Sequence, residues 1–171
     1  MKKFLAIAVG ITAAAGIGAV AGSYYTAHAQ AAQPQFTHVE YYSTEHIKEL
    51  LDQAFADPKS KAAGSGGVDL SDDANHQIKT SVRTRSGGAE VHKHWADVII
   101  VRGGEVTLIT GGTVPDQDNP ASDEPRGTKI VGGTEHHLKA GDIVHIPPST
   151  PHQMIVPPGG KFSAIVVKVH E

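Results

Sequence analysis

The chain has 171 residues, of which 15 are Lys or Arg, 18 are Asp or Glu and none is cysteine. This length favours a single domain, and the lack of cysteine excludes a disulfide-stapled scaffold. Aromatic residues make up 5% of the chain, and no basic stripe accompanies them, so nucleic acid is not expected as a partner. Histidine is the unusual component, with 11 residues.

The N-terminal segment has the pattern of a secretory signal peptide. Basic Met1-Lys2-Lys3 precedes an apolar stretch rich in Ala and Gly, and Ala27-His28-Ala29 forms a small-x-small cleavage site. A transmembrane anchor is the alternative, because the stretch is about long enough to span a bilayer. Its weak hydrophobicity favours cleavage after Ala29, which predicts a periplasmic or secreted protein with no membrane attachment. Loss of Lys2 and Lys3 leaves 13 basic and 18 acidic side chains, a net charge of −5.

Residues 30–75 are expected to hold one helix and a linker. Ser43 or Thr44 can cap a helix that runs to about Ala56, and Asp57-Pro58 ends it. The apolar positions have the spacing of an amphipathic helix and are Ile47, Leu50, Leu51, Ala54 and Phe55. We expect this helix to lie outside the main fold, where it also offers a face for a homodimer. Residues 59–67 are predicted to be a linker and residues 68–75 a polar loop.

Residues 76–171 show the pattern of an all-β domain. Ile78, Thr80 and Val82 alternate with polar residues, which indicates a half-buried strand. Short strands then follow to about residue 169, separated by Gly and Pro turns, as in a sandwich or barrel. Residues 95–101 and 105–110 are predicted to form a hairpin about a Gly103-Gly104 turn. The acidic residues 115–125 lack the spacing and glycine of a calcium loop, so we expect a solvated loop.

Two histidines two residues apart are the first candidate ligands. His92 and His94 fall in a predicted strand at residues 89–94. Side chains at i and i+2 of a strand share a face, roughly 6–7 Å apart, so both imidazoles can approach one metal ion. Imidazole is a common ligand for transition metals. A third ligand must come from elsewhere in the chain, and His152, at the end of the run from Gly141, is the best candidate.

These residues also carry a family resemblance. His92, His94 and Gly104, followed by Gly141, Pro147 and His152, match the two motifs of the cupin superfamily over about residues 78–169, and the chain resembles a single-domain, cupin type-2 barrel protein. Where the second motif usually has a glycine, this chain has Ser149. The resemblance implies an all-β jelly-roll barrel with the N-terminal helix outside it. It also implies one divalent metal, Fe, Zn, Mn or Ni, and a small-molecule ligand or substrate.

One departure from the cupin pattern affects the ligand set. The family's glutamate would fall at Val98 or Ile99, and the nearest acid is Asp97. In a strand unbroken from His92, Asp97 would face away from the metal, whereas a turn at Trp95-Ala96 would let it reach inward. The resemblance therefore implies ligation by His92, His94 and His152 and leaves Asp97 open. Residues expected to line the pocket or support the ligands are His145, Gln153, Trp95 and Val98.

The sequence leaves two classes of function open. One is a metal-dependent enzyme that acts on a small molecule, either of the dioxygenase type or of the isomerase or lyase type. A rigid apolar pocket would favour the dioxygenase, and the available residues are Trp95, Val98, Ile100, Ile143 and Met154. A general base such as His145 or Asp97 would favour the isomerase or lyase. The other class is a non-catalytic cupin that binds or senses a small ligand with its metal in place.

Overall fold

The computed structural model describes residues 39–171, of which residues 40–171 form one compact unit. The predicted signal peptide and its cleavage site lie outside the described residues. Within the described part of the chain, no helix has the length and apolar character needed to cross a bilayer.

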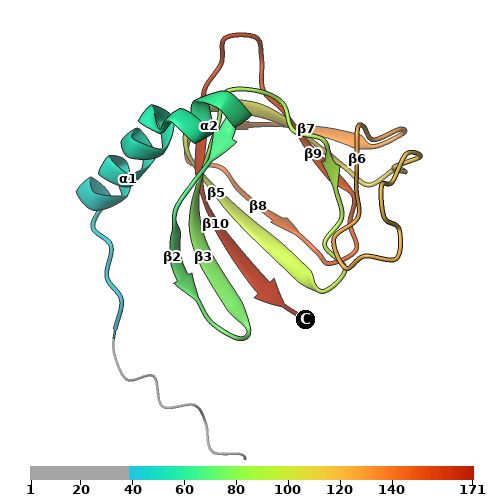
Figure 1. Ribbon diagram of the computed structural model, residues 1–171, viewed down its shortest axis with the longest axis horizontal. Helices are drawn as coiled ribbons and strands as arrows, with labels where there is room; N and C mark the ends of the chain where they lie inside the picture. The colour runs from blue at the N-terminus through green and yellow to red at the C-terminus, as the bar shows by residue number, and fades with distance from the viewer. Residues whose placement is uncertain (1–38) are drawn as a thin grey trace, which may run out of the picture. The chain divides into compact units, whose positions relative to one another are not determined.

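The compact unit is mostly β-structure, with its helices at the N-terminal side of the chain (Figure 1). Within residues 39–171 the elements are α1 (Thr44–Ala56), α2 (Pro58–Ala63), β1 (Ser65–Gly66), β2 (Asp69–Asp72), β3 (His76–Arg83), β4 (Ala89–Glu90), β5 (Trp95–Thr110), β6 (Arg126–Gly127), β7 (Thr134–Lys139), β8 (Ile143–Ile146), β9 (His152–Ile155) and β10 (Phe162–His170). The strands follow the order β1-β3-β10-β5-β9-β4-β6, with β2 added to β3, and with β7 and β8 added to β5. This arrangement confirms the predicted fold class, an all-β jelly-roll barrel with a helix outside it.

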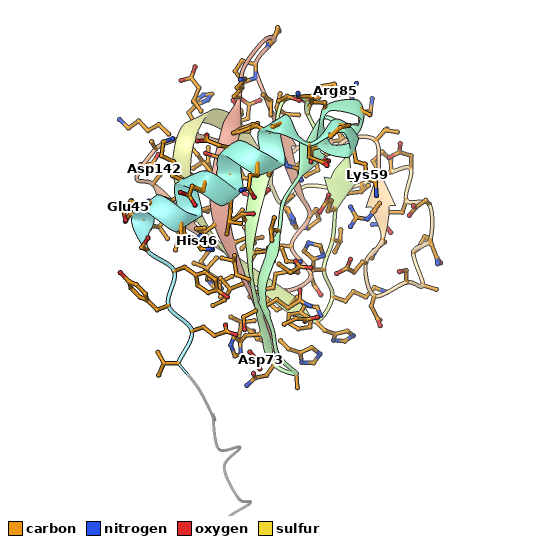
Figure 2. The ribbon with its side chains drawn as sticks, turned by 60° about the vertical axis from the view of Figure 1, so that its left-hand side comes forward. Glu45, His46, Lys59, Asp73, Arg85 and Asp142 are labelled. Carbon is orange, nitrogen blue, oxygen red and sulfur yellow. The ribbon has the colours of Figure 1, made fainter. Side chains whose placement is uncertain are left out.

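Helix α1 packs on the outer side of the strands (Figure 2). Ser43 begins it, and the Ser43 hydroxyl accepts a hydrogen bond from the His46 amide at 3.1 Å. The buried residues Ile47, Leu51 and Ala54 form a cluster with Val82 of β3. The apolar stripe is therefore used within the chain, which leaves little of it for a partner. A homodimer stays a prediction.

Residues 58–72 are more ordered than the sequence suggested, and the linker and loop predicted there are wrong. Asp57 caps a second helix, because its side chain accepts a hydrogen bond from the Ser60 amide at 2.7 Å. Pro58 is at the first turn of α2, where its missing N–H has no cost, so Asp57-Pro58 starts one helix as it ends another. Strands β1 and β2 then pair with β3 and extend the sheet.

The predicted hairpin at residues 95–110 is also wrong. Strand β5 runs through the two glycines as one strand of 16 residues. Its first half pairs with β8 and β10, and its second half pairs with β7 and β9. The pairing with β10 shifts register beside Gly103, and Gly104 has a φ of 73° with the Lys161 carbonyl close by. The glycines thus form a bulge that bends β5 between two sheets, rather than a reversal of the chain.

The apolar core fills one part of the barrel. Its buried residues are Ile99, Val101, Val106, Leu108, Leu138, Ile146, Met154, Val156, Phe162 and Ala164. Strand β3 has the predicted alternation, but its apolar residue Val82 packs beneath α1, outside the barrel. The opposite, polar face of β3 lines a cavity inside the barrel, with Gln77, Lys79, Ser81 and Arg83.

Candidate metal centre in a polar cavity

A cavity of about 530 Å³ opens inside the barrel beside the apolar core. Its lining includes the apolar side chains of Ile99, Met154 and Val166. The charged and histidine side chains that line it are Asp69, Lys79, Arg83, Glu90, His92, Asp97, Glu124, Arg126, His152 and Lys168. Of the five residues proposed for an apolar pocket, Met154 alone lines the cavity, so this interior is polar and charged.

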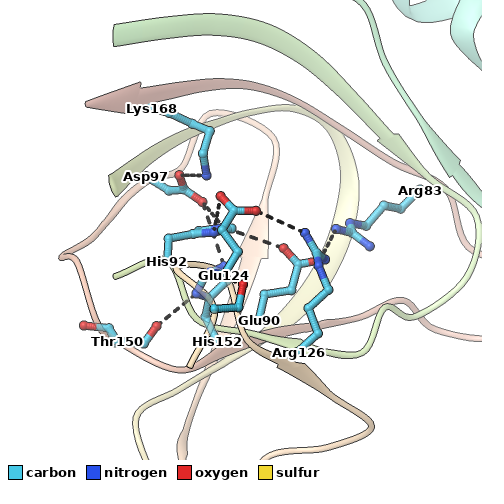
Figure 3. A network of polar contacts seen from close by, with 10 residues as sticks. Arg83, Glu90, His92, Asp97, Glu124, Arg126, Thr150, His152 and Lys168 are labelled. Carbon is cyan, nitrogen blue, oxygen red and sulfur yellow. Dashed lines mark hydrogen bonds and ion pairs between the residues drawn. The ribbon is translucent and has the colours of Figure 1, made fainter. Parts of the chain in front are cut away.

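Three potential metal ligands converge in this cavity (Figure 3). Ligand atoms of Glu90, His92 and His152 lie within 4.8 Å of one another. Glu90 of β4 pairs directly with His152 at the start of β9, and His92 follows β4 by two residues. Within residues 39–171 this is the single such group of His, Cys, Asp or Glu side chains. Two imidazoles and one carboxylate form a donor set that suits a divalent transition metal.

His152 is held in the tautomer that a metal ligand requires. The carbonyl of Thr150 lies 3.0 Å from its Nδ1, so Nδ1–H donates to that carbonyl and the lone pair is on Nε2. Nε2 points into the cluster, at 3.8 Å from Asp97 Oδ2. Burial lowers the pKa of His152 below its ordinary value and outweighs the opposing effect of the Thr150 carbonyl. The imidazole is therefore neutral near pH 7, and its orientation is fixed by the backbone, as in many metal sites.

His92 is 6% exposed, and its Nδ1 is buried with no well-formed hydrogen bond in the described part of the chain. Glu124 Oε1 lies 3.1 Å from this nitrogen, and Nε2 lies 3.7 Å from Glu90 Oε2. A buried ring nitrogen without a hydrogen bond is uncommon in folded proteins. The Glu124 carboxylate is the nearest partner for Nδ1, and Nε2 is the nitrogen that faces Glu90 and Asp97.

A backbone contact joins the two histidine segments. The Ser149 amide donates to the carbonyl of His92 at 2.7 Å. Ser149 has a φ of 60°, in the left-handed region that favours glycine. A glycine would adopt this backbone conformation without strain, and the chain has a serine here. It also holds the loop before His152 against the loop that contains His92.

Glu90 is ionised and held at one oxygen. Arg126 Nη1 lies 2.7 Å from Oε1, and Arg83 Nη2 lies 3.8 Å from the same atom. Burial alone would raise the pKa of Glu90, but Arg126 and Arg83 outweigh it and lower that pKa. The second oxygen, Oε2, faces His92 and is the one placed to bind a metal.

Asp97 faces the same cluster and pairs with a buried lysine. Its Oδ2 lies 3.5 Å from His92 Nε2, and its Oδ1 accepts a hydrogen bond from Lys168 Nζ at 2.7 Å. Burial opposes ionisation, yet His92 and Lys168 hold the pKa of Asp97 at about 2. Strand β4 ends at Glu90 and a new strand, β5, begins at Trp95. Asp97 therefore points into the barrel, which is the second of the two orientations that the sequence allowed. Asp97 borders the Glu90–His92–His152 group without belonging to it.

His94 does not join the cluster, and the prediction that it shares a strand face with His92 is wrong. Strand β4 ends at Glu90, and His94 lies in the loop that follows. The His94 side chain is 53% exposed, with Nε2 at 3.6 Å from Asp123 Oδ1. Its ring stacks on His170 with centroids 6.1 Å apart. The Val91 and Lys93 amides donate to the carbonyls of Pro125 and Asp123, which keeps the β4–β6 register, and the backbone then bends at Lys93-His94.

Of the four residues expected around the pocket, Gln153 lines the cavity, whereas Val98, His145 and Trp95 do not. Gln153 is buried at the cavity wall, but its amide hydrogens go to the carbonyls of Gly87 and Thr128, and its oxygen accepts from Ile130. Its side chain therefore joins two loop segments, one at Gly87 and one at residues 128–130. Val98 and His145 are paired across β5 and β8, in the alternate positions to inward-facing Asp97 and Ile99. Trp95 packs edge-on against His170, with centroids 5.0 Å apart.

Sequence reasoning missed Glu90, Lys168 and the arginines. Lys168 had a visible signal, because it interrupts the apolar run of residues 164–169 at an inward position. Glu90 precedes His92 by two residues, so the spacing used for His94 applied equally on its N-terminal side. The acidic loop of residues 115–125 proves to be part of the site wall, since Glu124 contacts His92. Asp118 accepts a hydrogen bond from the Arg126 amide of β6, and Asp116 accepts one from the Thr128 amide just after that strand.

Comparison with known proteins gives the fold. No protein-family model matches the sequence, and no curated protein matches it. Among solved structures, the chain is similar to an uncharacterized conserved protein with a double-stranded β-helix domain from Klebsiella pneumoniae. The identity is 18% and the TM-score 0.52, over 78% of this chain and 91% of that one. It is also similar to the protein TT1209 from Thermus thermophilus, at 15% identity and a TM-score of 0.53, over 77% of this chain and 98% of that one.

These likenesses, together with the strand order, define the barrel as a double-stranded β-helix, the jelly-roll architecture of cupins. A shared fold does not specify chemistry.

Proposed function

We propose that Glu90, His92 and His152 hold one divalent metal ion, and that the protein is a metal-dependent enzyme acting on a small molecule bound in the cavity. The observation that carries this proposal is the convergence of two buried imidazoles and one carboxylate within 4.8 Å. The fixed tautomer of His152 supports it, because a ligand imidazole usually donates its other N–H to a carbonyl or carboxylate.

The donor set favours the dioxygenase type among the enzymatic hypotheses. Two histidines and one carboxylate leave positions open at the metal, as in mononuclear non-haem iron oxygenases, while zinc in the same set would supply Lewis-acid chemistry. The isomerase or lyase hypothesis needs a general base near neutral pH. Asp97, with a pKa of about 2, is a weak base, and His145 lies outside the cavity lining.

The surrounding residues have separate tasks in this proposal. Thr150 fixes the ring of His152, and Arg126 fixes Glu90 through Oε1, so that Oε2 is directed at the metal position. Asp97 remains ionised beside both imidazoles because Lys168 compensates its charge. The cavity, with a volume of about 530 Å³, provides space for a small molecule next to these groups.

A second candidate is a non-catalytic protein that binds a small ligand. The observation in its favour is that the acids of the site already have cationic partners, with Arg126 on Glu90 and Lys168 on Asp97, both at 2.7 Å. A charge-compensated cluster of this kind can persist without turnover. Oxygen uptake or substrate conversion by the loaded protein would exclude this alternative.

The test is metal titration of the purified protein under anaerobic conditions, with Fe(II), Mn(II), Ni(II) and Zn(II) followed by calorimetry. We expect one equivalent to bind and His152→Ala to weaken binding at least 100-fold. His145→Ala, which removes a histidine outside the cavity, is the matched control and should bind like the parent protein. Equal affinity in the parent and His152→Ala would contradict the proposed site.

We also propose that the protein is exported and cleaved after Ala29, on the signal-peptide pattern of residues 1–29. Intact-mass measurement of the protein recovered from periplasm or culture medium should give a chain that begins at Gln30. A chain retained in the membrane with residues 1–29 attached would support the anchor instead.

A further inference from the structure

We propose that the cavity selects small organic anions, and that Lys79 and Arg83 of β3 bind the carboxylate or phosphate group of the ligand. This inference rests on the proposed function, which places the reacting end of the ligand at the metal. It adds the chemical class of ligand that the same cavity takes. It is built from the inward face of β3, from the pairing of the charges and from the size of the cavity.

The inward face of β3 is polar where a barrel interior is normally apolar. Lys79, Ser81 and Arg83 alternate along it, and Gln77 continues the row. Their neighbours on β10 are Val166, Ala164 and Phe162, and Gln77 lies opposite Lys168. Residues that lie directly opposite each other on neighbouring antiparallel strands contact one another. The four β3 side chains thus form one hydrophilic wall of the cavity.

The cations of the cavity fall into two groups by the closeness of their acidic partners. Lys168 and Arg126 lie 2.7 Å from Asp97 and Glu90. Lys79 lies 3.5 Å from Asp69, whose side chain is 72% exposed, and Arg83 lies 3.8 Å from Glu90. The first group compensates the acids of the site, whereas the second is loosely paired and available to a ligand.

Arg83 has further unused capacity. Its Nε is buried and has no hydrogen-bond partner among the described residues. Glu90 Oε1 is already engaged by Arg126, so it is a poor partner for the Arg83 guanidinium. A guanidinium presents planar donors that match two oxygens of a carboxylate or phosphate. An anionic ligand in the cavity would give the terminal nitrogens of Arg83 a closer partner than Glu90, which lies 3.8 Å from Nη2.

The total charge of the cavity agrees with an anionic ligand. Its cations are Lys79, Arg83, Arg126 and Lys168, and its acids are Asp69, Glu90, Asp97 and Glu124. Apart from the two imidazoles these charges cancel, and a divalent ion would leave an excess of two positive charges. An organic anion would offset that excess, and Gln77 and Ser81 could bind its hydroxyl or carbonyl groups. A volume of about 530 Å³ is in the range of small-molecule sites.

The experiment compares matched pairs of anionic and neutral probes by thermal shift and calorimetry. The pairs are gluconate with sorbitol, succinate with succinamide, and glycerol 3-phosphate with glycerol. We expect at least one anion to bind and its neutral partner not to bind; the first two pairs report a carboxylate and the third a phosphate. Neutral probes that bind as tightly as the anions, or no binding by any anion, would overturn the proposal.

Variants assign the binding to β3. Arg83→Gln and Lys79→Gln should each lower the affinity for the anion at least tenfold. Arg83→Lys should lower it less than Arg83→Gln does. Lys48→Gln removes an exposed cation on α1 and should leave the affinity unchanged. An unchanged affinity in both β3 glutamine variants, each shown to be folded by circular dichroism, would overturn the assignment.

Metal content measured on the same samples separates this inference from the proposed function. If the β3 variants lose the anion and keep the metal, both proposals stand. If the parent protein binds the anion through β3 but binds no metal, the proposed function fails and the anion site stands. If metal binds at His152 while every anion fails, the anion site alone is overturned.

Discussion

The two parts of the barrel interior differ sharply, although the same strands build both. Along the inward face of β10, Phe162 and Ala164 are fully buried in the apolar core, and Lys168 lies in the charged cavity. Strand β5 changes in the same way, from Leu108 and Val101 in the core to Asp97 in the cavity. Burial of charged groups costs free energy unless they are well paired. The core therefore stabilises the barrel, whereas the buried charges of the cavity cost free energy unless each keeps its partner.

The largest expected effect is a loss of stability on substitution in the apolar core. Phe162→Ala removes a side chain with no exposed surface, and we expect the free energy of unfolding to fall by about 3–5 kcal/mol. Chemical denaturation followed by circular dichroism measures the change. A loss below about 1 kcal/mol would show that the core does not depend on this residue as described.

The next effect concerns the charged side. Lys168→Met leaves the carboxylate of Asp97 buried without its ammonium partner, and we expect a loss of about 3 kcal/mol in the free energy of unfolding. The double variant Asp97→Asn with Lys168→Met removes both charges and should recover most of that loss. If the double variant is no more stable than the single one, the cost does not come from an unpaired carboxylate.

The smallest expected effect tests which residues of β5 face the cavity. Val98 alternates with the inward residues Asp97 and Ile99, and it lies opposite His145 on β8. Val98→Glu should therefore leave metal affinity unchanged within about twofold, because the new carboxylate points away from the cavity. Tighter metal binding in this variant would show that position 98 faces inward, as the usual cupin motif would place its glutamate.

The fold could be predicted from the sequence more completely than the site. The spacing of Ile47, Leu51 and Ala54 and the Ser43 cap located α1, and the two histidine motifs indicated the barrel. The course of β5 could not be predicted, because Gly103-Gly104 is compatible with both a hairpin turn and a bulge. Which occurs depends on pairing with β10, a contact more than 50 residues away along the chain.

The site was predicted in part. The structure brings His92 and His152 together, with ring centroids 5.1 Å apart, and their role as metal ligands stays a prediction. His94 and Glu90 each lie two residues from His92, and local spacing cannot decide between them. The decision is tertiary: Glu90 pairs with His152, and the chain bends at Lys93-His94, which leaves the His94 side chain exposed.

That choice between Glu90 and His94 gives the most direct test of the proposed metal centre. Metal content by mass spectrometry should be compared for the parent protein, Glu90→Gln and His94→Ala, all purified in the same way from the native compartment. We predict one equivalent of metal in the parent and in His94→Ala, and a loss of most of it in Glu90→Gln. Metal retained in Glu90→Gln and lost in His94→Ala would contradict the two-histidine, one-carboxylate site.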